Sequence, residues 1–256
     1  MVTCIPGATA SRAVVHQCGE KLVVGKGMVK QLSSFSYPCL QVFDEDAESE
    51  EVYLQCTAPL LKVAAANGVA TCFMYGQTGS GKTHTMSTIQ ACVAADIFEL
   101  AGGQPIFLAY FELIGKRCYD LLDPEHTEVF LKEGQDGQVH IAGAGELQVE
   151  SSEELIAGMK AALSRREVAS TGANASSSRS HAVCRIRIGD GKDRGMLTLV
   201  DLAGSERKHD SMYHDAEARK SGAEINSSLM ALKECIRYRA LQTGDPSAKV
   251  RLNVTM

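Results

Sequence analysis

The sequence predicts an α/β fold in which a mixed, mainly parallel sheet is covered by helices on both faces. Three observations lead to this prediction. Short apolar runs typical of strands alternate with amphipathic segments typical of helices. The 256 residues are 45% apolar and 22% charged, enough to bury one substantial core within one domain, residues 1–256. Residues 71–75 (TCFMY) resemble a doubly covered strand and lead directly into a glycine-rich loop and a helix.

The first half of the chain supplies two expected helices and three strands. Apolar residues spaced four, four and three apart predict a helix ending at Asn67-Gly68, namely Val52, Cys56, Leu60 and Val63. Strand 71–75 follows. The next helix ends at Gly102-Gly103 and has a comparable apolar side, formed by Ile89, Val93, Ile97 and Leu100. Residues 106–113 and 117–122 predict two strands around Gly115.

The second half continues the alternation. Ser151 and Glu154 form a capping-box pattern that opens a helix, whose apolar side is Leu155, Ile156, Met159 and Leu163. Residues 181–188 alternate as a half-buried strand does, and a turn at 189–191 leads to a partner strand from Met196. A long helix follows, with apolar Ile225, Leu229, Leu232 and Ile236 on one side and Lys233 and Arg237 on the other.

Charge and cysteine content exclude some classes of protein. The net charge of −5 argues against a nucleic-acid binder whose whole surface is basic. Residues 207–251 carry nine Lys or Arg against six acids, an excess of +3 that suits an acidic partner, although a solvated helix face would explain it too. Nine cysteines without a C-x-x-C pair fit reduced core thiols better than disulfides or a zinc site. With neither a leader pattern nor 18 consecutive apolar residues, we expect a soluble, intracellular protein without a membrane partner.

Residues 76–83 (GQTGSGKT) match the phosphate-loop pattern G-x-x-x-x-G-K-S/T. In such a loop the backbone N–H groups encircle phosphate oxygens, the lysine reaches the β and γ phosphates, and the hydroxyl coordinates Mg²⁺. The alternative is a glycine-rich turn between strand and helix with an exposed lysine. The expected nucleotide-binding residues are Gly76, Gln77, Thr78, Gly79, Ser80, Gly81, Lys82 and Thr83.

A second element of a nucleotide site is expected in LTLVDLAGSE. Asp201 ends an apolar strand, where its carboxylate can hold Mg²⁺ through water. Gly204, three residues later, offers a backbone N–H to the γ-phosphate. Without the phosphate loop, an ordinary turn would be the favoured explanation of both residues.

A third motif makes the set specific. Residues 174–181 (NASSSRSH), together with GQTGSGKTHTM and DLAGSE, are similar to the three nucleotide motifs of the kinesin motor domain. The resemblance continues through ATCFMY before the loop and GAEINSSLMALKECIR after it, and it covers residue 40 to the end. ATCF and LKECIR look most like kinesin-13, the internal-motor class that depolymerises microtubules.

The resemblance implies a microtubule-stimulated ATP hydrolase that uses Mg-ATP. Ser178 would help to ligate Mg²⁺, Ser177 would help to position the attacking water, and Arg179 would pair with Glu206 so that two switch loops close over the γ-phosphate. Further roles would fall to His84 against the adenine, and to Asn174 and Asn226 in hydrogen bonding to the switch loops.

The resemblance also identifies an acidic partner. In kinesins the loop after DLAGSE and the following helix bind the acidic surface of tubulin, so the expected partner is the microtubule and the expected location is the cytoplasmic cytoskeleton. The candidate microtubule-binding residues are Arg207, Lys208, Arg219, Lys220, Lys233, Arg237 and Arg239.

Three departures from the family pattern bear on activity. No R-x-R-P segment precedes Ile5, the chain stops at Met256 before the family's final strand and helix, and K-V-D is absent near 23–30. Because the missing strands would flank TCFMY, we expect that strand to have an unpaired apolar edge, and the 256 residues to bind ATP weakly and hydrolyse it slowly. The alternative is that Val14-Val15 or Val23-Val24 fill the gap.

Three functions remain in competition. The first is an ATP-hydrolysing microtubule motor or depolymerase. The second is a non-motor kinesin-like module that binds microtubules or nucleotide without efficient turnover. The third, an unrelated phosphate-loop enzyme such as a small GTPase, is disfavoured because no N-K-x-D motif occurs and S-S-R-S-H has no place in it. Direction of movement, cargo and oligomeric state do not follow from the sequence.

Overall fold

The computed structural model describes residues 2–3, 11–23, 27–39, 41–43, 46–133, 139–168, 179–191, 194–205 and 216–242. The chain divides into two compact units, residues 1–52 and 53–256. The prediction of a single domain over residues 1–256 stays a prediction.

The smaller unit is built from antiparallel pairs of strands. β2 (Ser11–Val23) pairs along its whole length with β3 (Gly27–Cys39), and β1 (Val2–Thr3) pairs with β4 (Gln41–Val42). The short helix α1 (Ser49–Val52) follows. Val14, Val15 and Val23, considered above as partners for strand 71–75, are paired with β3 instead; Val24 lies outside the described residues.

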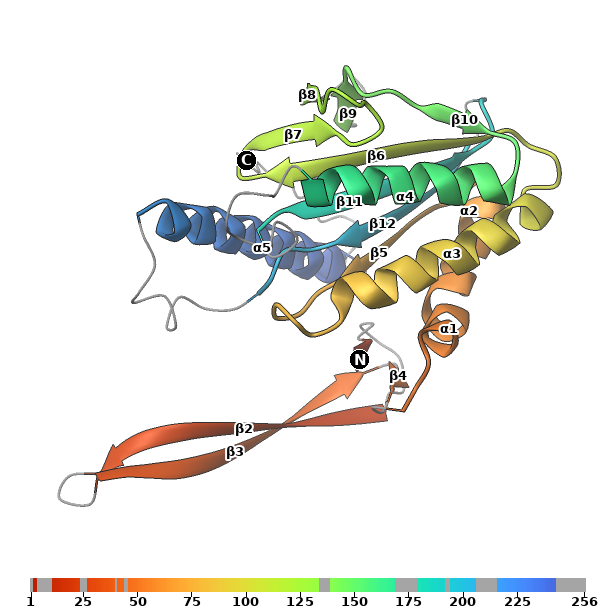
Figure 1. Ribbon diagram of the computed structural model, residues 1–256. Helices are drawn as coiled ribbons and strands as arrows, with labels where there is room; N and C mark the ends of the chain where they lie inside the picture. The colour runs from red at the N-terminus through yellow and green to blue at the C-terminus, as the bar shows by residue number, and fades with distance from the viewer. Residues whose placement is uncertain are drawn as a thin grey trace. The chain divides into compact units, whose positions relative to one another are not determined.

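The larger unit contains one sheet of eight strands (Figure 1). Seven of them lie in the order β5 (Val69–Met74), β12 (Gly195–Asp201), β11 (His181–Ile188), β6 (Ile106–Ile114), β7 (Arg117–Asp120), β8 (Glu128–Glu133) and β9 (Val139–Ala142). The eighth, β10 (Leu147–Val149), pairs with the start of β6.

The directions of the described strands correct one expectation. The sheet is mixed, as expected, but only the β5–β12 pairing is parallel among the described pairings, so the sheet is not mainly parallel there. The reason lies in the short connections. β6 turns into β7 at Gly115 (φ 59°), and β11 leads to β12 through the turn that begins at Gly189 (φ 83°). Neighbouring strands joined by such short turns must run antiparallel.

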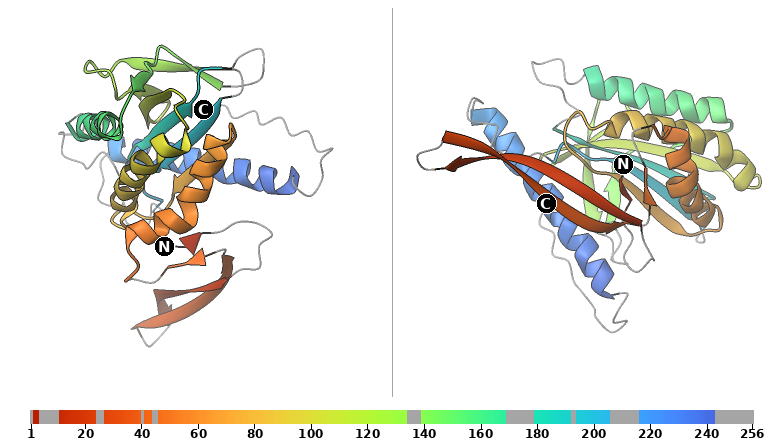
Figure 2. Two further views of the ribbon diagram at one scale, coloured as in Figure 1. Left: turned by 90° about the vertical axis from the view of Figure 1, so that its right-hand side faces the viewer. Right: turned by 90° about the horizontal axis from the view of Figure 1, so that it is seen from below.

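Helices cover both faces of this sheet, as predicted (Figures 1 and 2). α2 (Ala58–Ala65), α3 (Lys82–Leu100) and α4 (Ser152–Val168) lie on one face, and α5 (Ala216–Gln242) lies on the other. A π-helical turn, η1 (Tyr53–Thr57), precedes α2 where the sequence predicted a continuous helix. Within the described ranges, none of the helices is both long and apolar enough to cross a membrane.

Successive side chains of each strand point to opposite faces of the sheet and so form two separate apolar layers, one on each face. Cys184, Ile186, Leu197 and Leu199 are fully buried on the face covered by α3 and α4. On the opposite face, one apolar cluster joins the strands to α5 and contains Val183, Val200, Leu202, Ala203, Ile225, Leu229 and Leu232. The same alternation decides which face each polar side chain of β11 and β12 reaches.

The cysteines that the structure describes fit the expected role of core thiols. Six of them form no disulfide within the described part of the chain, of which Cys118 and Cys184 are buried and the other four are partly buried. Burial raises the pKa of the Cys118 thiol to about 11, and it raises that of Cys184 as well.

β5 lies at one end of the described sheet. Among the described strands it pairs with β12 alone, and the side chains of Val69 and Phe73 are 73% and 40% exposed. This agrees with the apolar edge expected for residues 71–75.

The close approach of α2 to β12 yields a test of this packing. A Cβ on Gly195 would lie 1.8 Å from the carbonyl oxygen of Ala64, which is backbone and cannot move away cheaply. We therefore expect Gly195→Ala to lower the free energy of unfolding by about 3 kcal/mol. Gly191→Ala is the matched control, because a Cβ there meets nothing within 4 Å. Equal urea midpoints for the two variants would contradict the packing.

Candidate functional site

The loop between β5 and α3 is shaped by its glycines. Gly79 and Gly81 have φ of 78° and 85°, in the left-handed region that only glycine adopts without strain. A Cβ on Gly76 would lie 2.7 Å from Ser80 Oγ. Gly81 is the N-cap of α3, and because it lacks a side chain it leaves the helix's first N–H groups without a cap from that position. These groups are suited to bind an anion.

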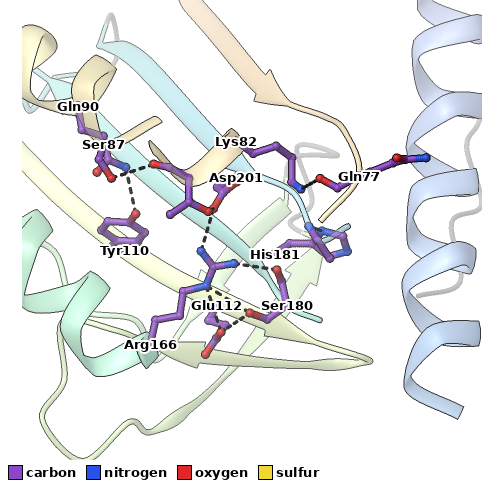
Figure 3. A network of polar contacts seen from close by, with 12 residues as sticks. Gln77, Lys82, Ser87, Gln90, Tyr110, Glu112, Arg166, Ser180, His181 and Asp201 are labelled. Atoms are coloured by element: carbon purple, nitrogen blue, oxygen red, sulfur yellow. Dashed lines mark hydrogen bonds and ion pairs between the residues drawn. The ribbon is translucent and has the colours of Figure 1, made fainter. Parts of the chain in front are cut away.

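Lys82, the first residue of α3, folds back over this loop. Its Nζ donates a hydrogen bond of 2.9 Å to the carbonyl oxygen of Gln77 (Figure 3). The Ser80 N–H donates to the same carbonyl at 3.2 Å. The positive charge is therefore held beside the N–H groups of the loop, where both would face the same anion.

Asp201 lies beside the loop because two strands end in register. In the parallel β5–β12 pair, Asp201 is opposite Met74, two residues before Gly76. The Thr83 Oγ1 donates to Asp201 Oδ2 at 2.8 Å. Beyond β12, the Leu202 N–H donates to the Met74 carbonyl and the Ser205 N–H to the Gly76 carbonyl. The structure thus brings together the loop, Thr83, Asp201 and the buried Gly204.

A buried arginine that the sequence analysis missed joins this group from α4. Arg166 Nη1 lies 3.0 Å from Asp201 Oδ2, its Nη2 donates to the Ser180 carbonyl at 2.8 Å, and its Nε lies 3.4 Å from Glu112 Oε1. The Ser180 hydroxyl donates to Glu112 as well (Figure 3). One signal was present in the sequence, because Glu112 interrupts an otherwise apolar strand and such a buried charge needs a partner.

The donor set suits a hard divalent cation. Thr83 and Asp201 present oxygen atoms 2.8 Å apart, and the buried Asp201 Oδ1 has no hydrogen-bond partner among the described residues. Hydroxyl and carboxylate oxygens are the ligands that Mg²⁺ prefers, directly or through water. The residues present therefore fit the metal that a phosphate loop requires.

His181 lies on the opposite face of the sheet from Asp201. Its Nδ1 accepts a hydrogen bond of 3.0 Å from the Ala203 N–H, and its Nε2 lies 2.8 Å from Ser228 Oγ of α5. Burial lowers the pKa of His181 most, and the nearby positive charge of Arg166 lowers it further. The negative charge of Asp201 raises it by less, and the resulting pKa is about 4. The imidazole is therefore neutral near pH 7.

The remaining predicted residues fall into two groups. Arg179 is partly buried in a turn before β11, His84 is exposed in the first turn of α3, and Asn226 is partly buried on α5. The other predicted residues lie outside the described part of the chain, either entirely or with respect to their side chains. They are Asn174, Ser177, Ser178, Glu206, Arg207, Lys208, Arg219, Lys220 and Arg239.

Two of the predicted microtubule-binding residues lie in the described part of α5. Lys233 and Arg237 are exposed and four residues apart, so they share one side of the helix. Arg237 Nη1 donates to Glu234 Oε1 at 2.8 Å, and Lys233 Nζ lies 5.4 Å from the centre of the Tyr75 ring. Both cations are therefore accessible from solvent while lying against a neighbour.

The low pKa of His181 gives a pH prediction. Because folding lowers this pKa from 6.5 to about 4, the unfolded chain binds the proton more tightly, and the stabilisation present above pH 6.5 is lost as the pH falls towards 4. We expect wild type to lose up to about 3 kcal/mol more than His181→Gln across this interval. Urea unfolding at several pH values measures it, with exposed His84→Gln as the control. Parallel curves for wild type and His181→Gln would contradict the prediction.

Comparison with known proteins agrees with this geometry. The sequence profile described as "Kinesin motor domain" matches residues 10–250. Diatom spindle kinesin-1 from Cylindrotheca fusiformis is 42% identical over 218 residues, which cover 82% of this chain and 35% of that protein. Kinesin-like protein KIF24 from Homo sapiens is 42% identical over 238 residues, covering 88% and 17%. Kinesin-like protein KIN-13B from Arabidopsis thaliana is 38% identical over 211 residues, covering 77% and 31%.

The chain spans about a third or less of the length of these relatives. The profile match nevertheless extends over almost all of its residues, including the loop, the end of β12 and α5. Together with identities near 40% to several kinesins, this shows that the chain belongs to the kinesin motor domain family.

Proposed function

We propose that this chain binds Mg-ATP at residues 76–83, hydrolyses it, and couples the closure of its switch loops to microtubule binding. The observation that carries the proposal is the hydrogen bond between Thr83 Oγ1 and Asp201 Oδ2. It joins the last residue of the phosphate loop to the acid at the end of β12, so one site combines the residues that bind phosphate with those that suit Mg²⁺.

Each residue of the loop has a separate task in this proposal. The N–H groups of the loop and of the α3 N-terminus bind the phosphate oxygens, and the Lys82 amine moves from Gln77 to the β and γ phosphates. Thr83 and Asp201 would hold Mg²⁺, Asp201 through water. The metal, when bound, neutralises charge that develops on the phosphate oxygens. His84, exposed at the start of α3, would lie against the adenine.

The switch residues are assigned from the kinesin motifs. Ser178 ligates the metal, Ser177 positions the attacking water, the Gly204 N–H contacts the γ-phosphate, and Arg179 pairs with Glu206 when both loops close. The described contacts of Arg166 support this assignment, because its guanidinium binds Asp201 and the carbonyl of Ser180, next to Arg179. Arg166 would hold both switch segments at one fixed distance from the loop.

Within the family we propose the kinesin-13 class and a location on the microtubules of the cytoplasm. The segments ATCF and LKECIR support this class, and so does the 38% identity to the protein named KIN-13B. The microtubule-binding side would be α5 and the loop before it, where positive charge gathers on an otherwise acidic chain.

Replacing the loop lysine tests nucleotide binding. We expect Lys82→Ala to weaken Mg-ADP binding about 10- to 100-fold, because a hydrogen bond from a charged group to phosphate is lost. Titration calorimetry measures the affinity, and Lys62→Ala, which removes an exposed charge from α2, is the control. Equal affinities for wild type and Lys82→Ala would overturn the proposed site.

A matched pair of triple variants tests microtubule binding. We expect Lys233→Ala, Arg237→Ala and Arg239→Ala together to reduce the fraction that sediments with microtubules, and we expect binding of wild type to weaken as salt rises. The control removes three exposed charges elsewhere, at Lys62, Lys132 and Lys160, and so changes net charge equally. If both triple variants bind alike at low salt, the microtubule lies against another surface.

A further inference from the structure

We propose that His181 is a positioning residue that couples the end of β12, beyond Asp201, to helix α5 through Ser228. The inference rests on the proposed function for its role in joining the nucleotide site to the microtubule-binding helix. The coupling itself is a property of the folded chain without nucleotide and can be tested there.

The hydrogen bonds of His181 form a series in which every donor-to-acceptor direction runs from Ala203 towards α5. The Ala203 N–H donates to Nδ1 at 3.0 Å, so in the neutral ring the proton lies on Nε2. Nε2 then donates to Ser228 Oγ at 2.8 Å, and the Ser228 hydroxyl donates to the Ile225 carbonyl at 2.7 Å. Each donor has one acceptor, and both ring nitrogens are used.

This series of hydrogen bonds begins at the segment that follows Asp201 and leads away from the nucleotide site. Ala203 lies in the segment after Asp201. In this segment the Leu202 N–H donates to the Met74 carbonyl of β5, and the Ser205 N–H donates to the Gly76 carbonyl of the phosphate loop. The segment is therefore held on one side by the loop and on the other by His181. A shift of Gly204 towards a phosphate must displace the Ala203 N–H relative to the imidazole.

Burial makes joint movement the favourable response. His181 is 9% exposed and the Ala203 residue is fully buried, so a broken bond would leave a polar group without water or another partner. The imidazole is planar and rigid, and its two nitrogens are fixed relative to each other. A displacement at Nδ1 is therefore passed to Nε2 and on to Ser228 of α5.

The apolar cluster between β12 and α5 does not provide the same link. Leu202, Ala203, Ile225 and Leu229 pack together, but dispersion contacts can slide with little change in energy. Hydrogen bonds depend on direction as well as distance. Among the described residues, His181 thus provides the polar connection that fixes α5 against the end of β12. The low pKa of His181 agrees with this role, because a cationic imidazole could not accept the hydrogen bond from the Ala203 N–H.

The test measures whether a change on α5 is felt at Ala203 in the nucleotide-free chain. We expect Ser228→Ala to speed the exchange of the Ala203 amide hydrogen about fivefold or more, measured by NMR, and to move the ¹⁵N resonance of His181 Nε2. Ser227→Ala, the exposed neighbour on the same helix, should change neither. Ser228→Thr keeps the hydroxyl and should restore both towards wild type.

Two results would overturn the coupling. One is an Ala203 exchange rate that is the same in Ser228→Ala and Ser227→Ala. The other is a Ser228→Thr variant that behaves like Ser228→Ala, since this would show general loosening of α5 rather than loss of the hydrogen bond. Neither readout requires nucleotide, so a failure of Mg-ADP binding in calorimetry would overturn the proposed function and leave this result standing.

Discussion

The buried guanidinium of Arg166 is the group on which the candidate site depends. It lies between the carboxylates of Glu112 and Asp201, and all three residues are at most 4% exposed. An isolated charge at such depth would be costly, but here the hydrogen bonds to Ser180 and Asp201 and the ion pair with Glu112 compensate for lost hydration. Because its partners come from β6, β12 and the segment before β11, the arginine fixes the distance between three parts of the chain.

Parts of this arrangement followed from the sequence because they depend on neighbours along the chain. The loop at 76–83 needs glycines at Gly79 and Gly81 for backbone conformation, and the alternation of 181–188 predicts β11 to the residue. Asp201 was placed correctly at the end of its strand. In each case the deciding physical constraint acts over a few residues.

Other parts depend on contacts that no local pattern encodes. Glu112 and Arg166 meet only because β6 and α4 share a face of the sheet, and His181 meets Ser228 only because α5 covers the other. The expectation of a mainly parallel sheet was wrong for the described strands, because strand direction depends on which strands become neighbours. The β2–β3 pair was not foreseen, since its residues lack a sustained alternation of polar and apolar side chains.

The alternation of β12 also restricts how this family can vary. Leu197, Leu199 and Asp201 face α3 and α4, while Val200 faces α5. One residue inserted between Gly195 and Asp201 would exchange these two sets, so that the carboxylate would enter the apolar layer under α5 and lose both Thr83 and Arg166. An insertion in the connection after β11 leaves the alternation within β12 itself unchanged, so this restriction does not apply there. Homologous chains should therefore tolerate insertions and deletions between residues 189 and 194, and exclude them from the seven residues that follow.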